Sequence, residues 1–224
     1  MKIINRINQA FSYPDYVKVL IPFQVGGISD CIDWPQDYVD RLGRSGGGRN
    51  ILHYQLFSKL KRQGVSEVDY LELGVFLGST INSIIAVAEI FDIKLNITAV
   101  DTFKGSENED MTNFIEHYDV TNSFKNKFIN NLNNEDIKKC IEIFEGTTDD
   151  FFIKNKKKYD LIFIDADHSK EAVTKDILNS LKSIKENGIV SGDDYHPCWG
   201  VFDAVNNFHK DKTINAVAEL WYFQ

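Results

Sequence analysis

The stretch from residue 65 to residue 80 constrains the fold of this 224-residue chain more than any other part of the sequence. An apolar run from Val65 to Leu73 has the length of a buried strand. Gly74 and Gly78 bracket a turn, and Ser79 opens a segment with helical periodicity. Glycines let a ligand approach the bare backbone, and the start of a helix offers unpaired N–H groups. The segment therefore predicts a strand, a ligand-binding turn and a helix.

From residue 50 onward, helical and strand patterns alternate along the chain. The expected helices cover 50–61, 79–91, 120–134, 148–156, 169–186 and 199–210, and the expected strands cover 65–73, 95–101, 139–144, 159–165, 188–193 and one strand or a pair within 213–223. This alternation predicts an α/β fold with a doubly wound, mostly parallel sheet of about seven strands covered by helices on both faces.

The first 50 residues differ from the rest, because they hold three of the four prolines and two glycine clusters. We expect residues 1–50 to form an irregular N-terminal cap or lid with short helices, and residues 51–224 to form the main domain.

Composition excludes several classes of function. The net charge of −8 argues against nucleic acid as a partner, because phosphate binding needs a basic surface. No segment approaches the ~18 apolar residues of a membrane span, and Lys18 and Pro22 interrupt the best signal-peptide candidate. Cys31, Cys140 and Cys198 lack the spacing of a zinc site or a disulfide framework. We expect a soluble, cytoplasmic protein without nucleic-acid or membrane partners, and a homo-oligomer is left open.

Carboxylates stand at the ends of nearly all the expected strands. They are Glu72, Asp101, Glu145, Asp165, Asp193 and Asp194. Parallel sheets of this kind bind ligands at the carboxyl ends of their strands. The sequence therefore predicts one ligand site along this edge of the sheet.

Two of these segments resemble a known family. Residues 72–78 resemble the first motif of the class I S-adenosylmethionine-dependent methyltransferases, in which acid-x-Gly-x-x-x-Gly wraps the methionine end of the cofactor. Residues 101–105, Asp-Thr-Phe-Lys-Gly, are similar to a segment of small-molecule O-methyltransferases that finish macrolide and aminocoumarin sugars. The chain resembles catechol O-methyltransferases more distantly. The resemblance runs from about residue 50 to the C-terminus and implies the class I strand order, with the last strand antiparallel.

The resemblance implies S-adenosylmethionine as cofactor. It assigns cofactor contacts to Glu72, Gly74, Gly78, Ser79, Asp101, Thr102 and Asp165, with Gly146 and Thr147 toward the adenine. A nicotinamide dinucleotide fits less well, because Phe76 replaces the middle glycine of that motif. Asp101 also follows Glu72 by 29 residues, whereas the dinucleotide pattern places its acid ~20 residues on.

A second constellation joins residues 165–168, Asp-Ala-Asp-His, with residues 192–195, Gly-Asp-Asp-Tyr. Bare carboxylates at adjacent strand ends repel one another, and hard oxygen ligands suit Mg²⁺, Mn²⁺ or Ca²⁺. The resemblance to metal-dependent members of the family assigns a divalent cation, Mg²⁺ first, to Asp165, Asp193 and Asp194. The simpler interpretation is a solvated acidic rim.

A base must take the proton of the substrate hydroxyl, and Asp167 and His168 are both candidates. Catechol-type relatives carry a lysine at the position of His168, and sugar-modifying relatives use an acid at the position of Asp167. A histidine suits proton transfer near neutral pH, so the choice stays open.

The substrate is less constrained. A metal site favours two adjacent oxygens, as in a sugar diol or a catechol, and the resemblance favours a sugar or polysaccharide precursor. Arg44 and Arg49, in a glycine-rich stretch, could pair with the diphosphate of a nucleotide sugar. Aromatic candidates for an apolar substrate pocket are Phe103, Tyr118, Tyr195 and Trp199.

Two other functions remain as alternatives. A non-catalytic cofactor-binding module would not need four acids at one edge of the sheet. An iron- and 2-oxoglutarate-dependent hydroxylase could use His117 and Asp119 with His168 or His196, although such sites usually lie on double-stranded β-helices and this chain is expected to contain too much α-helix.

Overall fold

The computed structural model describes residues 18–19, 47–105, 123–132, 134–217 and 219–223. Arg44, His117, Tyr118 and Asp119, four of the candidate residues above, lie outside these ranges.

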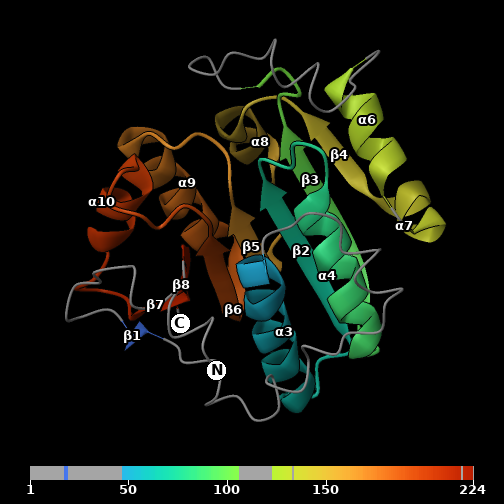
Figure 1. Ribbon diagram of the computed structural model, residues 1–224, viewed down its shortest axis with the longest axis horizontal. Helices are drawn as coiled ribbons and strands as arrows, with labels where there is room; N and C mark the ends of the chain where they lie inside the picture. Colours follow the sequence, from blue (N-terminus) through green and yellow to red (C-terminus); the bar gives the residue numbers. More distant parts are fainter. Residues whose placement is uncertain (1–17, 20–46, 106–122, 133, 218, 224) are drawn as a thin grey trace.

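Helices and strands alternate along the described chain, as the sequence predicts (Figure 1). The helices are α3 (Gly47–Arg62), α4 (Ser79–Ile90), α6 (Phe124–Asn131), α7 (Glu135–Cys140), α8 (Thr148–Lys154), α9 (Lys170–Ser183) and α10 (Gly200–Asn206). The strands are β1 (Lys18–Val19), β2 (Glu67–Leu73), β3 (Lys94–Asp101), β4 (Glu142–Glu145), β5 (Tyr159–Ile164), β6 (Ile184–Gly192), β7 (Ile214–Val217) and β8 (Leu220–Phe223).

All the strands join one sheet in the order β1-β7-β8-β6-β5-β2-β3-β4. Strand β8 is antiparallel to its neighbours β6 and β7, and the other pairings are parallel. The predicted doubly wound sheet with an antiparallel last strand is confirmed. The two-residue β1 extends the seven expected strands and was not predicted.

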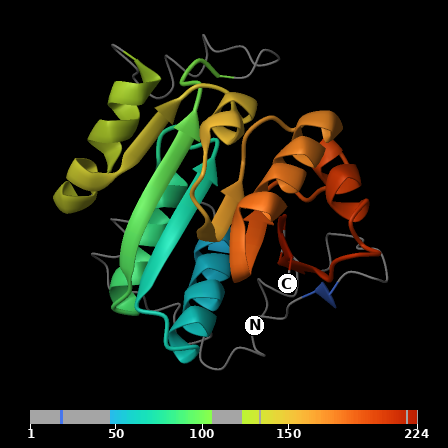
Figure 2. The same ribbon diagram turned by 180° about the vertical axis from the view of Figure 1, so that it is seen from behind.

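Helices cover both faces of the sheet and enclose two apolar cores (Figures 1 and 2). Because side chains alternate along a strand, neighbouring residues of β2 and β5 enter different cores. Tyr70 and Phe163 pack with α3, α4 and α6, whereas Leu71 and Ile162 pack with α8, α9 and α10. None of the described helices has the length and hydropathy that crossing a membrane requires.

Many boundaries differ from the predicted ones by a few residues, and three of these differences have a clear structural basis. Helix α3 begins at Gly47, inside the segment expected to be an irregular cap. The helix expected over 120–134 corresponds to α6 (Phe124–Asn131). A separate short helix, α7 (Glu135–Cys140), follows and takes the first residues of the strand expected over 139–144; Asn134 caps it by accepting hydrogen bonds from the N–H groups of Asp136 and Ile137. The last turn of the helix expected over 169–186 is instead the start of β6, because Ile184 pairs with Tyr159 across the sheet.

Candidate active site

Gly74 brings the carboxyl ends of β2 and β5 into contact. Its φ of +82° lies in the left-handed region, and its N–H donates to the carbonyl of Val100 at 2.8 Å. A Cβ at this position would lie only 2.0 Å from the carbonyl oxygen of Asp165. The carbonyl group of Asp165 thus occupies the space that a side chain at this position would need, and the cofactor contact of Gly74 stays a prediction. The glycine therefore sets Asp165 against the turn.

The other end of the turn packs equally closely. Gly78, with a φ of +85°, is the N-cap of α4, and Ser79 is the first residue of that helix. A Cβ on Gly78 would lie 2.9 Å from the ring of Phe128 on α6. Both glycines are thus needed by the backbone path that presents the first turn of α4 at the sheet edge.

Asp101 holds the turn in shape. Its Oδ2 accepts hydrogen bonds from the N–H groups of Val75 and Phe76, at 2.9 and 2.8 Å, and its Oδ1 accepts one from Phe103 at 2.6 Å. A carboxylate offers about four acceptor sites. Asp101 is therefore chiefly a backbone anchor here, with about one acceptor site left for the cofactor contact predicted for it.

The predicted adenine-side residues lie beside Asp101 at the end of β4. The Gly146 N–H donates to the Asp101 carbonyl at 2.9 Å. Thr147 caps α8 by accepting from the Asp150 N–H at 3.1 Å. Thr102, which follows Asp101, accepts from the Lys104 N–H at 3.2 Å. These residues form one continuous edge with the glycine turn.

Glu72 is enclosed below this edge. Its side chain is buried, and its Oε2 accepts a 2.6 Å hydrogen bond from the hydroxyl of Tyr70. Burial raises the pKa of Glu72 to about 8; the Tyr70 bond opposes this rise, and the charge of Asp165 adds to it. Glu72 is therefore bonded to Tyr70 inside the core, and the cofactor contact assigned to it stays a prediction.

The acids at the ends of β5 and β6 meet around an arginine from α3. Arg49 Nε lies 2.5 Å from Oδ2 of Asp193, and its Nη2 lies 3.1 Å from Oδ2 of Asp165. Its Nη1 donates to the hydroxyl of Thr80 at 2.9 Å. The expectation that Arg49 projects from a lid toward a diphosphate does not match this position, since its guanidinium faces the acids.

Burial and mutual repulsion perturb these acids. Burial raises the pKa of Asp165 to about 7; Arg49 opposes this rise, and the charges of Asp193 and Asp194 add to it. Burial likewise raises the pKa of Asp193, again opposed by Arg49. Perturbed carboxyl groups of this kind cluster at functional sites.

Asp194 and His168 form a pair beside Asp165. His168 Nε2 lies 2.9 Å from Oδ2 of Asp194 and 4.0 Å from Oδ1 of Asp165. Asp194 has a φ of +56°, a left-handed conformation that aspartate adopts more readily than most residues. The His168 ring lies 5.3 Å from that of Trp199, whose side chain is 46% exposed.

The donors fit a divalent cation. Among the described residues, ligand atoms of Asp165, His168 and Asp194 gather within 4.8 Å of one another, about the spread of ligands that lie ~2.1–2.4 Å from one ion. Asp193, the third predicted ligand, is instead turned to Arg49 and to the Asp194 N–H. Asp165 and Asp194 are thus the predicted metal ligands that the structure brings together.

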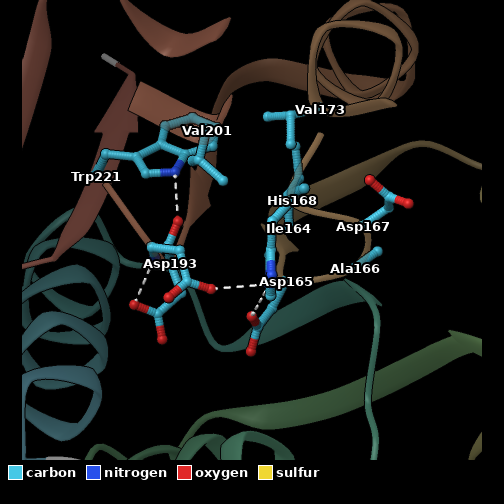
Figure 3. Close-up of a pocket in the computed structure, with 10 residues that line it drawn as sticks. Ile164, Asp165, Ala166, Asp167, His168, Val173, Asp193, Val201 and Trp221 are labelled. Carbon is cyan, nitrogen blue, oxygen red and sulfur yellow. Dashed lines mark hydrogen bonds and ion pairs between the residues drawn. The ribbon is translucent and has the colours of Figure 1, made fainter. Parts of the chain in front are cut away.

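The two candidate bases have different surroundings. Figure 3 shows the carboxylate of Asp167 directed away from those of Asp165 and Asp193. Its Oδ1 accepts from the Ser169 N–H at 2.6 Å, and hydrogen bonding to Ser169 lowers the pKa of Asp167. His168 is part-buried and paired with an acid, as a base held in position would be.

Several contacts of the site were not predicted. Arg49 and His53 lie one helical turn apart on α3, and His53 is fully buried with its Nδ1 3.1 Å from the hydroxyl of Ser83. The available signal was the four-residue spacing between His53, inside the helix expected over 50–61, and Arg49, just before its start. Of the aromatic pocket candidates, Tyr195 and Phe103 are core residues, and Trp199 stands at the site.

Known proteins share this architecture. A family model described as a methyltransferase domain matches residues 71–195. The O-methyltransferase NovP is similar, with a TM-score of 0.59 and 17% identity over 79% of each chain. The calicheamicin methyltransferase CalS11 has a TM-score of 0.59 and 13% identity, covering 96% of this chain and 95% of that one. Another structure of CalS11 is described as a TDP-rhamnose 3'-O-methyltransferase.

A methyltransferase from Podospora anserina, solved with S-adenosylhomocysteine, has a TM-score of 0.50 and 13% identity, covering 100% of this chain and 93% of that one. No curated protein sequence matches significantly. At these identities the structural likenesses establish the fold. The family model spans more than half of the chain and includes the glycine turn and the acids of β5 and β6, so the protein belongs to the methyltransferase-domain family and is an enzyme with the class I methyltransferase fold.

Proposed function

We propose that this methyltransferase transfers the methyl group of S-adenosylmethionine to a hydroxyl of a small molecule, with the help of a divalent cation. The observation that carries the proposal is the placement of Asp165, Asp194 and His168 together beside the glycine turn. A binding module needs the turn alone, whereas a base and a cation site at its edge serve a reaction.

The cofactor would lie along the edge from the turn to Gly146. The start of α4 offers backbone N–H groups there, and Asp101 keeps the turn in shape. S-adenosylmethionine, when bound, supplies an electrophilic methyl group. These residues would fix where that group is presented, beside Asp165.

His168 is the proposed base. A carboxylate bonded to one ring nitrogen orients an imidazole and makes its other nitrogen more basic. Asp194 is placed to do this, at 2.9 Å from Nε2. The substrate proton would pass to His168 as the new oxygen–carbon bond forms, leaving S-adenosylhomocysteine. Asp167, the other candidate, is exposed and bonded to the start of α9.

Asp165 and Asp194 would hold the cation, with Asp193 as third ligand once Arg49 leaves it. A bound Mg²⁺ or Mn²⁺ supplies Lewis acidity that lowers the pKa of a coordinated hydroxyl. Asp194 can serve both roles because its second oxygen is available in addition to Oδ2, which contacts His168.

The proposed substrate is a sugar or polysaccharide precursor with two adjacent hydroxyls, handled in the cytoplasm. Two similar structures are of enzymes described as an O-methyltransferase and as a TDP-rhamnose 3'-O-methyltransferase. The exposed Trp199 ring beside His168 offers an apolar surface on which a sugar ring could pack.

The test is formation of S-adenosylhomocysteine from S-adenosylmethionine with a panel of nucleotide sugars, polyols and catechols. We expect turnover that requires an acceptor, rises with Mg²⁺ or Mn²⁺ and stops with EDTA. Asp194→Asn should lower the rate by at least ~100-fold, whereas the control Asp203→Asn, an exposed acid of α10, should not. Cofactor binding without turnover across the panel would favour the non-catalytic module. A rate that EDTA does not change would show that the reaction needs no divalent cation.

A further inference from the structure

Arg49 occupies the position of a counter-ion in the acid cluster. Its guanidinium contacts one carboxylate oxygen of Asp165 and one of Asp193, the same two side chains that were predicted to ligate the cation. The arginine side chain is 25% exposed, and the two acids are 15% and 10% exposed. In such a sheltered position, electrostatic interactions are stronger than at an open surface.

The arginine and a divalent cation cannot both be held easily by these acids. Burial alone would lower the pKa of Arg49, but the charges of Asp165 and Asp193 raise it above its ordinary value. The guanidinium therefore remains positive at any working pH and repels a second cation nearby. It also takes the Oδ2 atom of each acid.

We propose that Arg49 is an internal competitor of the divalent cation, which binds Asp165 and Asp193 in the cation-free enzyme and must release them when the cation binds. This inference rests on the cation site of the proposed function and adds the residue that sets its affinity. In the absence of metal, the positive charge of Arg49 balances the negative charges of Asp165 and Asp193. Metal binding therefore exchanges one cation for another.

The surroundings of Arg49 allow this exchange without unfolding α3. Its Nη1 is already bonded to the hydroxyl of Thr80, on the first turn of α4. Glu72, when ionised, also acts on the guanidinium with its negative charge. Thr80 and Glu72 belong to α4 and β2, on either side of the glycine turn, so the arginine can keep these interactions while it releases Asp165 and Asp193.

The first experiment measures Mn²⁺ affinity by calorimetry at pH 8 on the cofactor-free protein. Arg49→Gln removes the competitor and should tighten Mn²⁺ binding by about tenfold or more, because a positive charge is lost beside the ion. Arg62→Gln is the matched control, since it makes the same charge change on an exposed residue of the same helix. It should change the affinity less than twofold.

A second measurement uses the wild-type protein, so it stands even where Arg49→Gln fails to fold. The Nε–Hε signal of Arg49 in a ¹⁵N–¹H spectrum, assigned by its loss in Arg49→Lys, should shift on saturation with Mg²⁺. An unchanged signal at saturation, or Mn²⁺ binding in Arg49→Gln no tighter than in wild type, overturns the competition. Absence of Mn²⁺ binding in every protein would instead show that the cation site itself is wrong.

Discussion

Two glycines in this chain have nearly the same left-handed backbone conformation but different surroundings. Gly74 and Gly64 have φ values of +82° and +80°. A Cβ on Gly74 would strike the backbone of Asp165, whereas one on Gly64 would meet nothing within 4 Å. Both substitutions to alanine incur the cost of a left-handed residue, about 1 kcal/mol, and only Gly74→Ala adds a collision.

Gly74→Ala should therefore lower the free energy of unfolding by several kcal/mol, on the order of 3–5, and weaken S-adenosylhomocysteine binding. Gly64→Ala should lose about 1 kcal/mol and keep its binding. Urea denaturation and calorimetry measure the two quantities. Equal losses in the two variants would mean that the turn relaxes away from β5, contrary to the close contact seen here.

His168 and Asp167 differ in what they can do for the reaction. His168→Ala should lower kcat by about 10²–10⁴-fold, the range of a lost general base, and added imidazole should restore part of the rate. Asp167→Asn should lower kcat less than tenfold, since this side chain bonds to the start of α9. The reverse order of effects would assign the base to Asp167.

The sequence predicted the positions of the acids in the site but not the contact between Arg49 and Asp193. Asp101, Asp165 and Asp194 could be placed from sequence, because each follows an apolar strand and parallel strands bring their ends to one edge. The Arg49–Asp193 contact joins residues 144 positions apart. It depends on how α3 lies across the sheet, and no local pattern specifies that.

Helix α9 carries a buried acid, Asp176, whose ionisation should make the stability of the protein depend on pH. Asp176 is 2% exposed and faces α8, where Thr148 bonds to it. Burial raises the pKa of Asp176 to about 7, with the Thr148 bond opposing and the charge of Asp149 adding. The folded protein therefore binds a proton here more tightly than the unfolded chain does. Stability from this group is present at low pH and is lost as pH rises from about 4 to about 7.

Asp176→Asn should remove this loss, because an amide can still accept from Thr148 but cannot ionise. We expect the variant to be more stable than wild type at pH 8 by about 2–4 kcal/mol. The advantage should shrink toward zero below pH 4. Denaturation curves across this range measure it, with Glu171→Gln, at an exposed residue of α9, as the control. A difference that does not vary with pH would contradict ionisation at Asp176.

The bounds of helices and strands were predicted well where apolar periodicity determines them. They were predicted less well where pairing between strands of the sheet determines them. Strand β5 is fully apolar in its centre and was placed within one residue. The end of α9 was not, because Leu181 and Ile184 keep helical spacing while Ile184 pairs with Tyr159 in the sheet. Pairing across the sheet overrides the local pattern there.

At the scale of the whole molecule, the last strand, β8, contacts the loop that carries two acids of the site. Strand β8 inserts antiparallel between β6 and β7. This insertion was expected from the family resemblance and not from the local pattern, which left one strand or two open. It places Trp221, which is fully buried, beneath the acids of β6. Its indole Nε1 donates to the carbonyl oxygen of Asp193 at 3.2 Å (Figure 3).

Trp221→Phe tests whether β8 positions the acid loop. The variant keeps an aromatic ring in the core but leaves the buried Asp193 carbonyl without this donor, so stability should fall by about 2–3 kcal/mol. Mn²⁺ affinity should fall about fivefold, because the loop that carries Asp193 and Asp194 is less firmly held. Tyr222→Phe is the control, since Tyr222 lies on the same strand but packs into the opposite core. A Trp221→Phe protein that loses stability yet binds Mn²⁺ as wild type does would show that the strand supports the core without positioning the acids.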